Sequence, residues 1–333
     1  MRRRTLLAAG GATAGVTVLG LAGCADITPA VTSGPPEKVT YLTGFNLTGQ
    51  DAPVFVAIEK GYFRDRRLEV AVKAGFGTGQ NLKLLRSGQA DFAVLDVTGA
   101  LLEYGAAGHR GFRMVAAYYQ RSVSCIMALQ SRGITQPRDL EGRRVGYTAG
   151  GVNKTLFPTY AKLAGVNDRA IRWTNLPPAQ LRPNLLAGQL DAVTEIVIGR
   201  PAVEAAAGQP VSVLPYSDHL RDLYGNALAT SLTTAMGNPR IVRRFRDAVL
   251  QGLAYAIDHP DEAGQIVTQH VKTYQATAAA AEVRAMAPFV RSGVGIGHID
   301  EARVAQSVAL LQAAGAIPEA IPPNEVVSLE LVP

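Results

Sequence analysis

Short apolar runs that end in polar residues recur along the chain. A run at 92–95 follows a helical stretch, 82–87, and Gly88 stands where a left-handed residue closes a helix at little cost. Runs of this length and uniformity are typical of buried strands. We expect further strands at 39–42, 68–72, 111–119, 125–129, 144–147, 171–173 and 211–214. Strands that alternate with helical stretches predict an α/β fold.

Helical periodicity is clearest in the last third of the chain. Asn238 and Pro239 form a typical helix start, with an N-cap followed by proline at the first helical position. Apolar or small residues then fall on one helical face, at Ile241, Phe245, Val249, Gly252 and Ala256. The alanine-rich stretch 263–311 also has a helical pattern, interrupted by a loop at 292–297.

One helix–strand unit occurs twice. The Gly-Gln-x-Asp sequence that links helix and strand at 88–91 returns at 188–191, again between a leucine-rich helix and an apolar strand. An acidic residue lies near the end of each strand, Asp96 in the first copy and Glu195 in the second. Because α/β sheets bind ligands at the carboxyl ends of their strands, the repeat predicts two similar lobes facing a shared cleft.

Composition agrees with a folded chain of two domains. The 333 residues are 47% hydrophobic and 18% charged, which excludes a disordered polypeptide. The formal charge of +6 falls to +3 without the three arginines of residues 1–23, so it is weak support for nucleic-acid binding. We therefore expect no nucleic-acid partner.

The first residues predict export and lipidation. Arg3 and Arg4 precede an apolar stretch at 6–21, as in a twin-arginine signal. The sequence 21–24, Leu-Ala-Gly-Cys, resembles the bacterial lipobox, in which the cysteine is lipidated and becomes the mature N-terminus. We expect a signal peptide at 1–23, a lipidated flexible tether at 24–38 beginning with Cys24, and no internal disulfide, because Cys125 is the one other cysteine.

The sequence contains no catalytic or metal-binding motif. The five histidines stand alone, without metal-ligand spacing, and no nucleophile elbow or Walker loop is present. The glycine-rich stretch 75–81 has Gln80 where the dinucleotide fingerprint requires glycine, although such a loop at a helix start can present backbone N–H groups to a ligand. We expect no catalytic residue, no metal and no cofactor.

Five segments in order carry a resemblance to a known family. The segments are 55–63 (FVAIEKGYF), 85–92 (LRSGQADF), 119–122 (YQRS), 139–146 (DLEGRRVG) and 224–226 (YGN). Together they resemble the substrate-binding proteins of ABC importers that serve sulfonates, nitrate, taurine and thiamin pyrimidine precursors. The resemblance covers nearly all of the chain after the tether.

The resemblance implies a type II periplasmic-binding-protein fold. Two α/β lobes, joined by a two-strand hinge, close on a ligand in the cleft between them. We expect the first lobe at 39–128 plus 230–333 and the second at 129–229. The resemblance implies a monomeric, extracytoplasmic solute-binding protein. The lipobox adds the expectation that the lipid on Cys24 anchors it to the outer face of the cytoplasmic membrane, with a periplasmic location as the alternative. Its implied partners are a small-molecule ligand, the ABC permease and its ATPase.

Acids and aromatic residues at strand ends and loops are the candidate ligand contacts. A carboxylate that faces an amine gains charge-assisted hydrogen bonds, and exposed rings can stack on a flat ligand. No arginine is clearly placed to clamp an anion, with Arg121 and Arg200 the nearest candidates. We therefore expect a thiamin pyrimidine precursor or similar amino-heterocycle. The expected contacts are Phe45, Asn46, Asp51, Thr78, Gln80, Asp96, Thr98, Tyr118, Tyr119, Tyr147, Thr148, Gly150, Glu195, Tyr216, Tyr224 and Asn226.

Three alternatives remain open. The first is a receptor for a sulfonate, taurine or nitrate anion within the same family. The second is an enzyme, because some relatives synthesise the thiamin pyrimidine with a histidine and a cysteine-rich iron motif, which this sequence lacks. The third is a lipoprotein that signals without transport.

Overall fold

The computed structural model describes residues 34–149 and 151–333. The chain divides into two units, Met1–Pro35 and Pro36–Pro333, and the architecture below is that of the second unit. The expected signal peptide, Cys24, most of the tether and Gly150 lie outside the described residues. Within the described part of the chain, no helix has the length and apolar character needed to cross a lipid bilayer.

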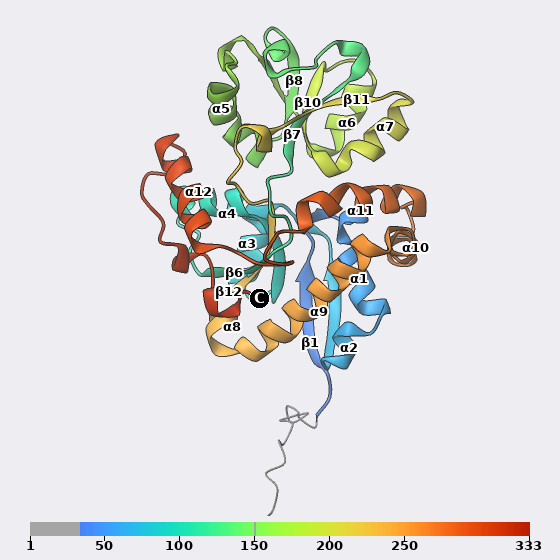
Figure 1. Ribbon diagram of the computed structural model, residues 1–333, viewed down its shortest axis with the longest axis vertical. Coiled ribbons are helices and arrows are strands. Elements are labelled where there is room, and N and C mark those ends of the chain that lie inside the picture. Colours follow the sequence, from blue (N-terminus) through green and yellow to red (C-terminus); the bar gives the residue numbers. More distant parts are fainter. Residues whose placement is uncertain (1–33, 150) are drawn as a thin grey trace, which may run out of the picture. The chain divides into compact units, whose positions relative to one another are not determined.

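The first lobe is built on a five-stranded sheet with the strand order β3-β1-β5-β12-β6 (Figure 1). Strand β1 pairs in parallel with both of its neighbours, whereas β12 is antiparallel to β5 and β6. A separate two-stranded ribbon, β2–β4, accompanies this sheet. The strands are β1 (Glu37–Leu42), β2 (Phe45–Asn46), β3 (Leu68–Lys73), β4 (Gly75–Phe76), β5 (Phe92–Asp96), β6 (Phe112–Ala117) and β12 (Asn226–Ser231).

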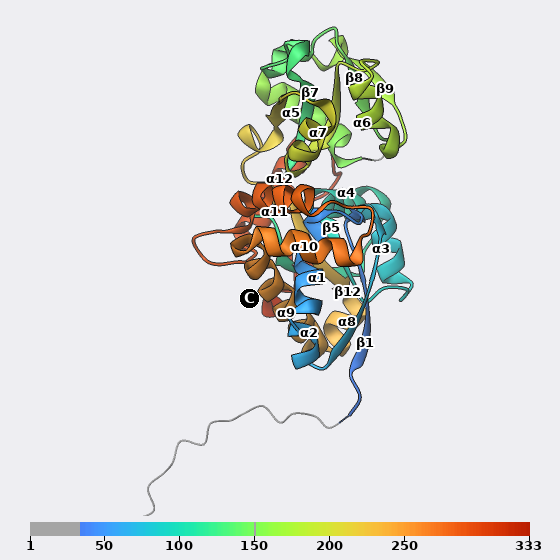
Figure 2. The same ribbon diagram turned by 90° about the vertical axis from the view of Figure 1, so that its right-hand side faces the viewer.

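Helix α9 packs on this sheet through the apolar face that the sequence predicts. Helix α9 buries Ile241, Phe245 and Val249, and Phe245 stacks on Phe92 of β5 with ring centroids 4.0 Å apart. Figure 2 shows α1, α9, α10 and α11 on one side of the lobe. The helices are α1 (Ala52–Glu59), α2 (Tyr62–Asp65), α3 (Thr78–Arg86), α4 (Val97–Ala107), α8 (Leu232–Gly237), α9 (Pro239–Asp258), α10 (Pro260–His270), α11 (Ala276–Val290) and α12 (Glu301–Ala313).

The second lobe has its own five-stranded sheet, with the order β11-β7-β10-β8-β9. Strand β7 is antiparallel to β10 and β11, and β8 is parallel to β10 and β9. The strands are β7 (Ser124–Leu129), β8 (Arg144–Tyr147), β9 (Arg172–Asn175), β10 (Ala192–Ile196) and β11 (Val211–Pro215), and the helices are α5 (Val152–Ala164), α6 (Pro178–Leu186) and α7 (Arg200–Ala207).

The chain crosses between the two lobes at earlier residues than the sequence predicts, in both directions. Strand β7 belongs to the second sheet, although residues 124–128 were assigned to the first lobe. Strand β12 belongs to the first sheet, although residues 226–229 were assigned to the second. Strand β7 is apolar after Ser124, and β12 has a short apolar centre, 227–229, between polar residues. Neither pattern says which sheet the strand joins. We therefore correct the boundaries to the segments between β6 and β7 and between β11 and β12.

Two hydrogen-bonded segments connect the lobes. Ser122 N donates to Leu223 O at 2.8 Å, and Gly225 N donates to Tyr119 O at 3.1 Å. A Cβ atom at Gly225 would lie 2.6 Å from Arg121 O, so only glycine permits this approach. Two adjacent chain segments therefore join the lobes, as expected, although they are not strands at these residues.

The repeated unit has the same geometry in both lobes. Gly88 and Gly188 end α3 and α6 with φ values of +70° and +72°. Three residues later an aspartate Oδ2 accepts from the parallel neighbour of the strand that follows it, Asp91 from Thr40 N of β1 at 2.8 Å and Asp191 from Arg144 N of β8 at 2.9 Å. The predicted duplication is confirmed at the level of single hydrogen bonds.

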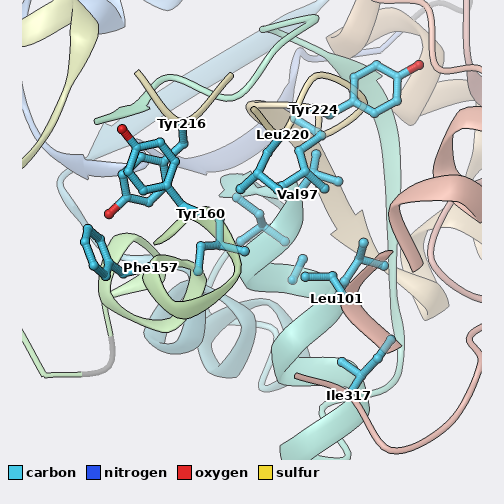
Figure 3. Packing of buried hydrophobic residues seen from close by; sticks show 14 of the residues in the cluster. Val97, Leu101, Phe157, Tyr160, Tyr216, Leu220, Tyr224 and Ile317 are labelled. Atoms are coloured by element: carbon cyan, nitrogen blue, oxygen red, sulfur yellow. The ribbon is translucent and has the colours of Figure 1, made fainter. Parts of the chain in front are cut away.

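One apolar cluster contains residues of both lobes (Figure 3). Tyr160 of α5 stacks on Tyr216 with ring centroids 4.4 Å apart. The same cluster contains Leu220 and, from the first lobe, Leu101 and Ile317. The cores therefore meet through the segment that follows β11.

Candidate ligand-binding cleft

A cleft of about 910 Å³ lies where strand ends and helix starts of both lobes come together. Its walls include the ends of β5 and β10, the residues after β6, and the first turns of α3, α5 and α6. A volume of this size is within the usual range for sites that enclose a small molecule. The duplicated unit therefore supplies one strand end to each wall, as expected.

Ten of the sequence-predicted contacts line this cleft. They are Phe45, Asn46, Asp51, Thr78, Asp96, Tyr118, Tyr119, Thr148, Glu195 and Asn226. Their contact with a ligand stays a prediction, but the structure brings them together from segments far apart in sequence.

Two predicted tyrosines belong to the core instead of the cleft. Tyr216 is fully buried against Tyr160, and its hydroxyl donates to Asn153 O at 2.9 Å. Tyr224 is 2% exposed, its hydroxyl accepts from Asp300 N at 2.8 Å, and Arg303 lies over its ring. Tyr216 directly follows β11, and Tyr224 lies in the loop before β12. Packing by residues distant in sequence buries both, as Figure 3 shows for Tyr216 against Tyr160.

Three other predicted contacts also lie outside the cleft lining. Tyr147 packs edge-on against Trp173. Thr98 is buried in the first turn of α4, and Gln80 is exposed on α3. The side chains of a helix's first turn point in different directions, so only some of them face the cleft. The sequence pattern does not say which ones.

Asp96 caps a helix and lines the cleft at the same time. Its Oδ1 accepts from Gly99 N at 2.8 Å, which closes the start of α4. Burial raises its pKa to about 6, although the backbone N–H groups of Gly99 and Thr98 act in the opposite direction. Near neutral pH this carboxylate is therefore charged but close to its midpoint.

Asp51 lies beside a second buried acid. Its Oδ2 accepts from Thr48 N at 2.8 Å, and the side chain is 7% exposed. Burial raises its pKa to about 7, Thr48 opposes the shift, and the nearby charge of Glu282 adds to it. The Glu282 carboxylate itself accepts hydrogen bonds from Gly49 N at 2.9 Å and from the Tyr274 hydroxyl. Asp51 can thus donate or accept a hydrogen bond near neutral pH.

Glu195 is paired with an arginine that the sequence analysis missed. Arg182 Nε of α6 donates to Glu195 Oε2 at 2.6 Å, and both side chains line the cleft. Gly199 makes room for the pair, because a Cβ atom there would lie 2.6 Å from Arg182 Nη2. The structure thus brings an arginine to the cleft, although the sequence showed none clearly placed to clamp an anion.

The two arginines considered from sequence have other partners. Arg121 lies over the Phe289 ring, and Arg200 pairs with Glu204 at 2.9 Å. The signal for Arg182 was its place on the helix that precedes the Glu195 strand, within the repeated unit.

Asn153 is a second functional candidate that the sequence analysis missed. Its Nδ2 donates to Glu195 O at 2.6 Å, and its Oδ1 accepts from the Ser124 hydroxyl at 3.0 Å. It therefore ties the start of α5 to the ends of β7 and β10 inside the cleft. In sequence it is one polar residue of a helix, which no pattern separates from a solvated face.

Two helices begin at the cleft with glycine N-caps. Gly77 precedes α3 and Gly151 precedes α5, and neither has a side-chain cap. The first N–H groups of such helices attract polar or anionic ligand atoms. The cleft thus combines carboxylates, one guanidinium and helix starts.

Comparison with known proteins gives relatives of two kinds. The chain is 24% identical over 321 residues to the riboflavin-binding protein RibY of Chloroflexus aurantiacus, covering 92% of this chain and 89% of that protein. It is 25% identical over 240 residues to the 4-amino-5-hydroxymethyl-2-methylpyrimidine phosphate synthase of Candida albicans, covering 68% and 69%.

A solved structure confirms the fold. The alkanesulfonate-binding protein SsuA from Xanthomonas axonopodis pv. citri, bound to MOPS, superposes with a TM-score of 0.70 at 17% identity, covering 89% of this chain and 99% of that one. The expected periplasmic-binding-protein fold is therefore correct. A family model described as NMT1/THI5 like matches residues 48–263, and this chain belongs to the NMT1/THI5-like family.

Proposed function

We propose that this protein is the solute-binding lipoprotein of an ABC importer, which captures one small molecule between its lobes outside the cytoplasm. The observation that carries the proposal is the cleft, whose lining comes from both lobes. The lobes are joined by two adjacent chain segments, an arrangement that permits closure by a hinge. The shared fold with SsuA supports the same role.

For the ligand we propose an amino-bearing flat heterocycle, such as a pyrimidine precursor of thiamin. Asp51, Asp96 and Glu195 line the cleft and can accept hydrogen bonds from ring amino groups. Phe45 and Phe76 line its edge and remain partly exposed. The names of the relatives, one for riboflavin and one for a pyrimidine phosphate, agree with this class.

An anionic ligand is the second candidate. Arg182 is 41% exposed at its side chain and could turn toward a sulfonate. The helix starts at Gly77 and Gly151 favour an anion too. Against it, Glu195 already accepts from Arg182, so an anion would meet a guanidinium whose charge is partly neutralised.

We propose binding without chemistry, although one relative is named a synthase. Cys125 is fully buried, and burial raises the pKa of its thiol well above the usual range, so it is not a nucleophile. A ligand that is recovered intact after binding supports this proposal, and turnover of the ligand contradicts it.

A thermal-shift screen followed by calorimetry tests the ligand class. The panel is riboflavin, 4-amino-5-hydroxymethyl-2-methylpyrimidine, taurine, an alkanesulfonate and nitrate. A true ligand at a hundred times its Kd stabilises the protein by about 2.7 kcal/mol and raises the Tm. If the protein binds none of these compounds, the proposed role as their receptor is contradicted.

Two matched substitutions then separate the two ligand classes. Glu195→Gln should weaken binding of an amino-heterocycle, whereas Glu204→Gln removes a comparable acid outside the cleft and should leave binding unchanged. Tight binding of the alkanesulfonate, unchanged or improved by Glu195→Gln, contradicts the heterocycle and supports the anion.

The membrane anchor is tested separately. We propose that the precursor is exported and cleaved before Cys24, and that the lipid on Cys24 holds the protein beside its permease and ATPase. The intact mass of protein from a membrane fraction should equal that of the lipidated chain from Cys24. A mature protein that begins at Met1, or one as soluble as a Cys24→Ala variant, contradicts the anchor.

A further inference from the structure

Two phenylalanines stand exposed at the edge of the cleft. Phe45 of β2 and Phe76 of β4 are 47% and 66% exposed, and both line the cleft. They are directly opposite each other in the antiparallel ribbon, so their side chains lie on the same face. The ribbon therefore presents a paired aromatic surface to the cleft.

This surface is held by buried polar groups. Asn81, fully buried in the first part of α3, donates to Thr43 O at 2.9 Å and to Val94 O at 3.1 Å. Its Oδ1 accepts from Phe76 N at 3.1 Å, so one amide joins both sides of the ribbon to β5. A two-residue ribbon is not stable alone, and the structure supplies the missing support.

The backbone of the ribbon has no tolerance for change. A Cβ atom at Gly75 would lie 1.8 Å from Thr43 O. Asn46 has a φ of +53°, a left-handed conformation that few residues adopt, and its carbonyl accepts from the Thr43 hydroxyl. Strained backbone persists where the surroundings enforce it, often at ligand sites.

We infer that Phe45 and Phe76 determine specificity by stacking on the flat ring of the ligand, a step that rests on the proposed function. Asn46 follows Phe45 in the chain, Thr78 lies two residues after Phe76, and Asp96 N donates to Thr78 Oγ1 at 3.0 Å. All three line the cleft, so polar atoms lie near the rings for the edge of a stacked ligand. A planar ligand covers exposed rings and gains contact over its whole face, which a small tetrahedral or trigonal anion does not. The second lobe has Leu181 at the position that corresponds to Asn81, and no matching ribbon among its described residues.

Calorimetry with riboflavin and with 4-amino-5-hydroxymethyl-2-methylpyrimidine tests the inference. Phe76→Ala and Phe45→Ala should each raise the Kd of the flat ligand about tenfold. Phe76→Tyr should keep the wild-type Kd, and Phe76→Leu should be intermediate, because it keeps apolar area and loses the ring face. Met236→Ala is the matched control, since Met236 is 75% exposed on α8 outside the cleft.

Each other outcome overturns the inference in a recognisable way. Alanine variants that bind the flat ligand like the wild type contradict stacking and leave the proposed function standing. A Phe76→Leu variant equal to wild type shows that apolar cover alone suffices, which also contradicts stacking. If the alanine variants keep the wild-type Kd but uptake in cells is lost, the two rings contact the permease instead of the ligand, which contradicts stacking. A wild type that binds no compound of the panel contradicts the inference and the proposed function together.

Discussion

Residues 82–96 of the first lobe and 182–196 of the second carry the same helix–loop–strand unit at positions that differ by one hundred. The first copy has Leu82 and Leu95, both fully buried in one apolar cluster. The second has Arg182 and Glu195 at those positions, ion-paired at 2.6 Å in the cleft. The glycine and aspartate of the loop keep the backbone alike, so the side chains at these two positions are free to differ.

The comparison also corrects how the strand-end acids correspond. Asp96 of β5 matches Ile196, and Glu195 of β10 matches Leu95, so the two acids are one residue out of register. Successive residues of a strand point to opposite faces of the sheet. Asp96 therefore serves a helix cap, which Glu195 does not. Equal loops do not imply equal chemistry at the strand end.

The largest expected effect tests whether the two copies are equivalent in packing. Leu85 and Leu185 occupy matching positions and are 1% and 0% exposed. Leu85→Ala and Leu185→Ala should each lower the free energy of unfolding by about 2–5 kcal/mol in urea titrations. A loss below about 1 kcal/mol for one of them would show that only one copy is a packing unit.

The loop aspartates should contribute nearly equally. Asp91→Ala and Asp191→Ala each remove the acceptor of a backbone N–H, at Thr40 and at Arg144, and should each cost about 1–3 kcal/mol. Asp191 also pairs with the Arg144 guanidinium, but that side chain is 45% exposed, so the pair should add little. A much larger loss for Asp191→Ala would assign its role to the arginine instead of the backbone.

The pH dependence of stability should have opposite signs at the two copies. The pKa of Asp96 is raised to about 6 by burial, so the folded state retains its proton longer and the free energy of unfolding falls as pH rises from about 4 to 6. Hydrogen bonds from Arg144, opposed by burial, lower the pKa of Asp191, so its contribution is lost as pH falls below about 4.

Urea unfolding between pH 3 and 8 measures both contributions. Asp96→Asn should remove roughly 1–2 kcal/mol of the fall in the free energy of unfolding between pH 4 and 6. This is less than the full pKa shift implies, because the Asp96 side chain is partly exposed. Asp51→Asn tests a second acid separately, because burial raises the pKa of Asp51 to about 7. An unchanged slope in Asp96→Asn would contradict the raised pKa.

The smallest effect is expected from the ion pair itself. Replacing both Arg182 and Glu195 by leucine reproduces the residues that the first copy has at these positions. A double-mutant cycle should give a coupling free energy of about 0.2–1 kcal/mol, because the Arg182 side chain is half-exposed. The pair of Arg200 and Glu204 is the matched control on the protein surface. A coupling well above this range would make the pair a structural element of the second lobe.

Much of the secondary structure was predictable from local patterns. Strand β8 has the predicted bounds, and the face of α9 through Phe245 and Val249 is buried as expected. The ribbon β2–β4 was not predictable, because strands of two residues have no periodicity. Its support, Asn81, resembles an ordinary residue of an early helical turn until the hydrogen-bond partners of its side chain are known.

The candidate site was predictable in part. Asp96 and Glu195 were found because strand ends of α/β sheets meet at one edge. Tyr216 directly follows β11 and Tyr224 lies in the loop before β12, yet both are core residues, since burial depends on what packs over such positions. The rule locates an edge of the sheet but does not say which side chains remain open to solvent.

The sequence by itself determined the local conformations and the duplication. Gly88 and Gly188 adopt a φ near +70° that other residues avoid, and an aspartate three residues later reaches the backbone of a neighbouring strand. These are short-range geometries that depend on residue type. Only the tertiary structure decided that Arg182 pairs with Glu195 and that Phe45 and Phe76 share one face. Such contacts join separate chain segments, and their positions follow from the packing of whole elements instead of from local conformational preference.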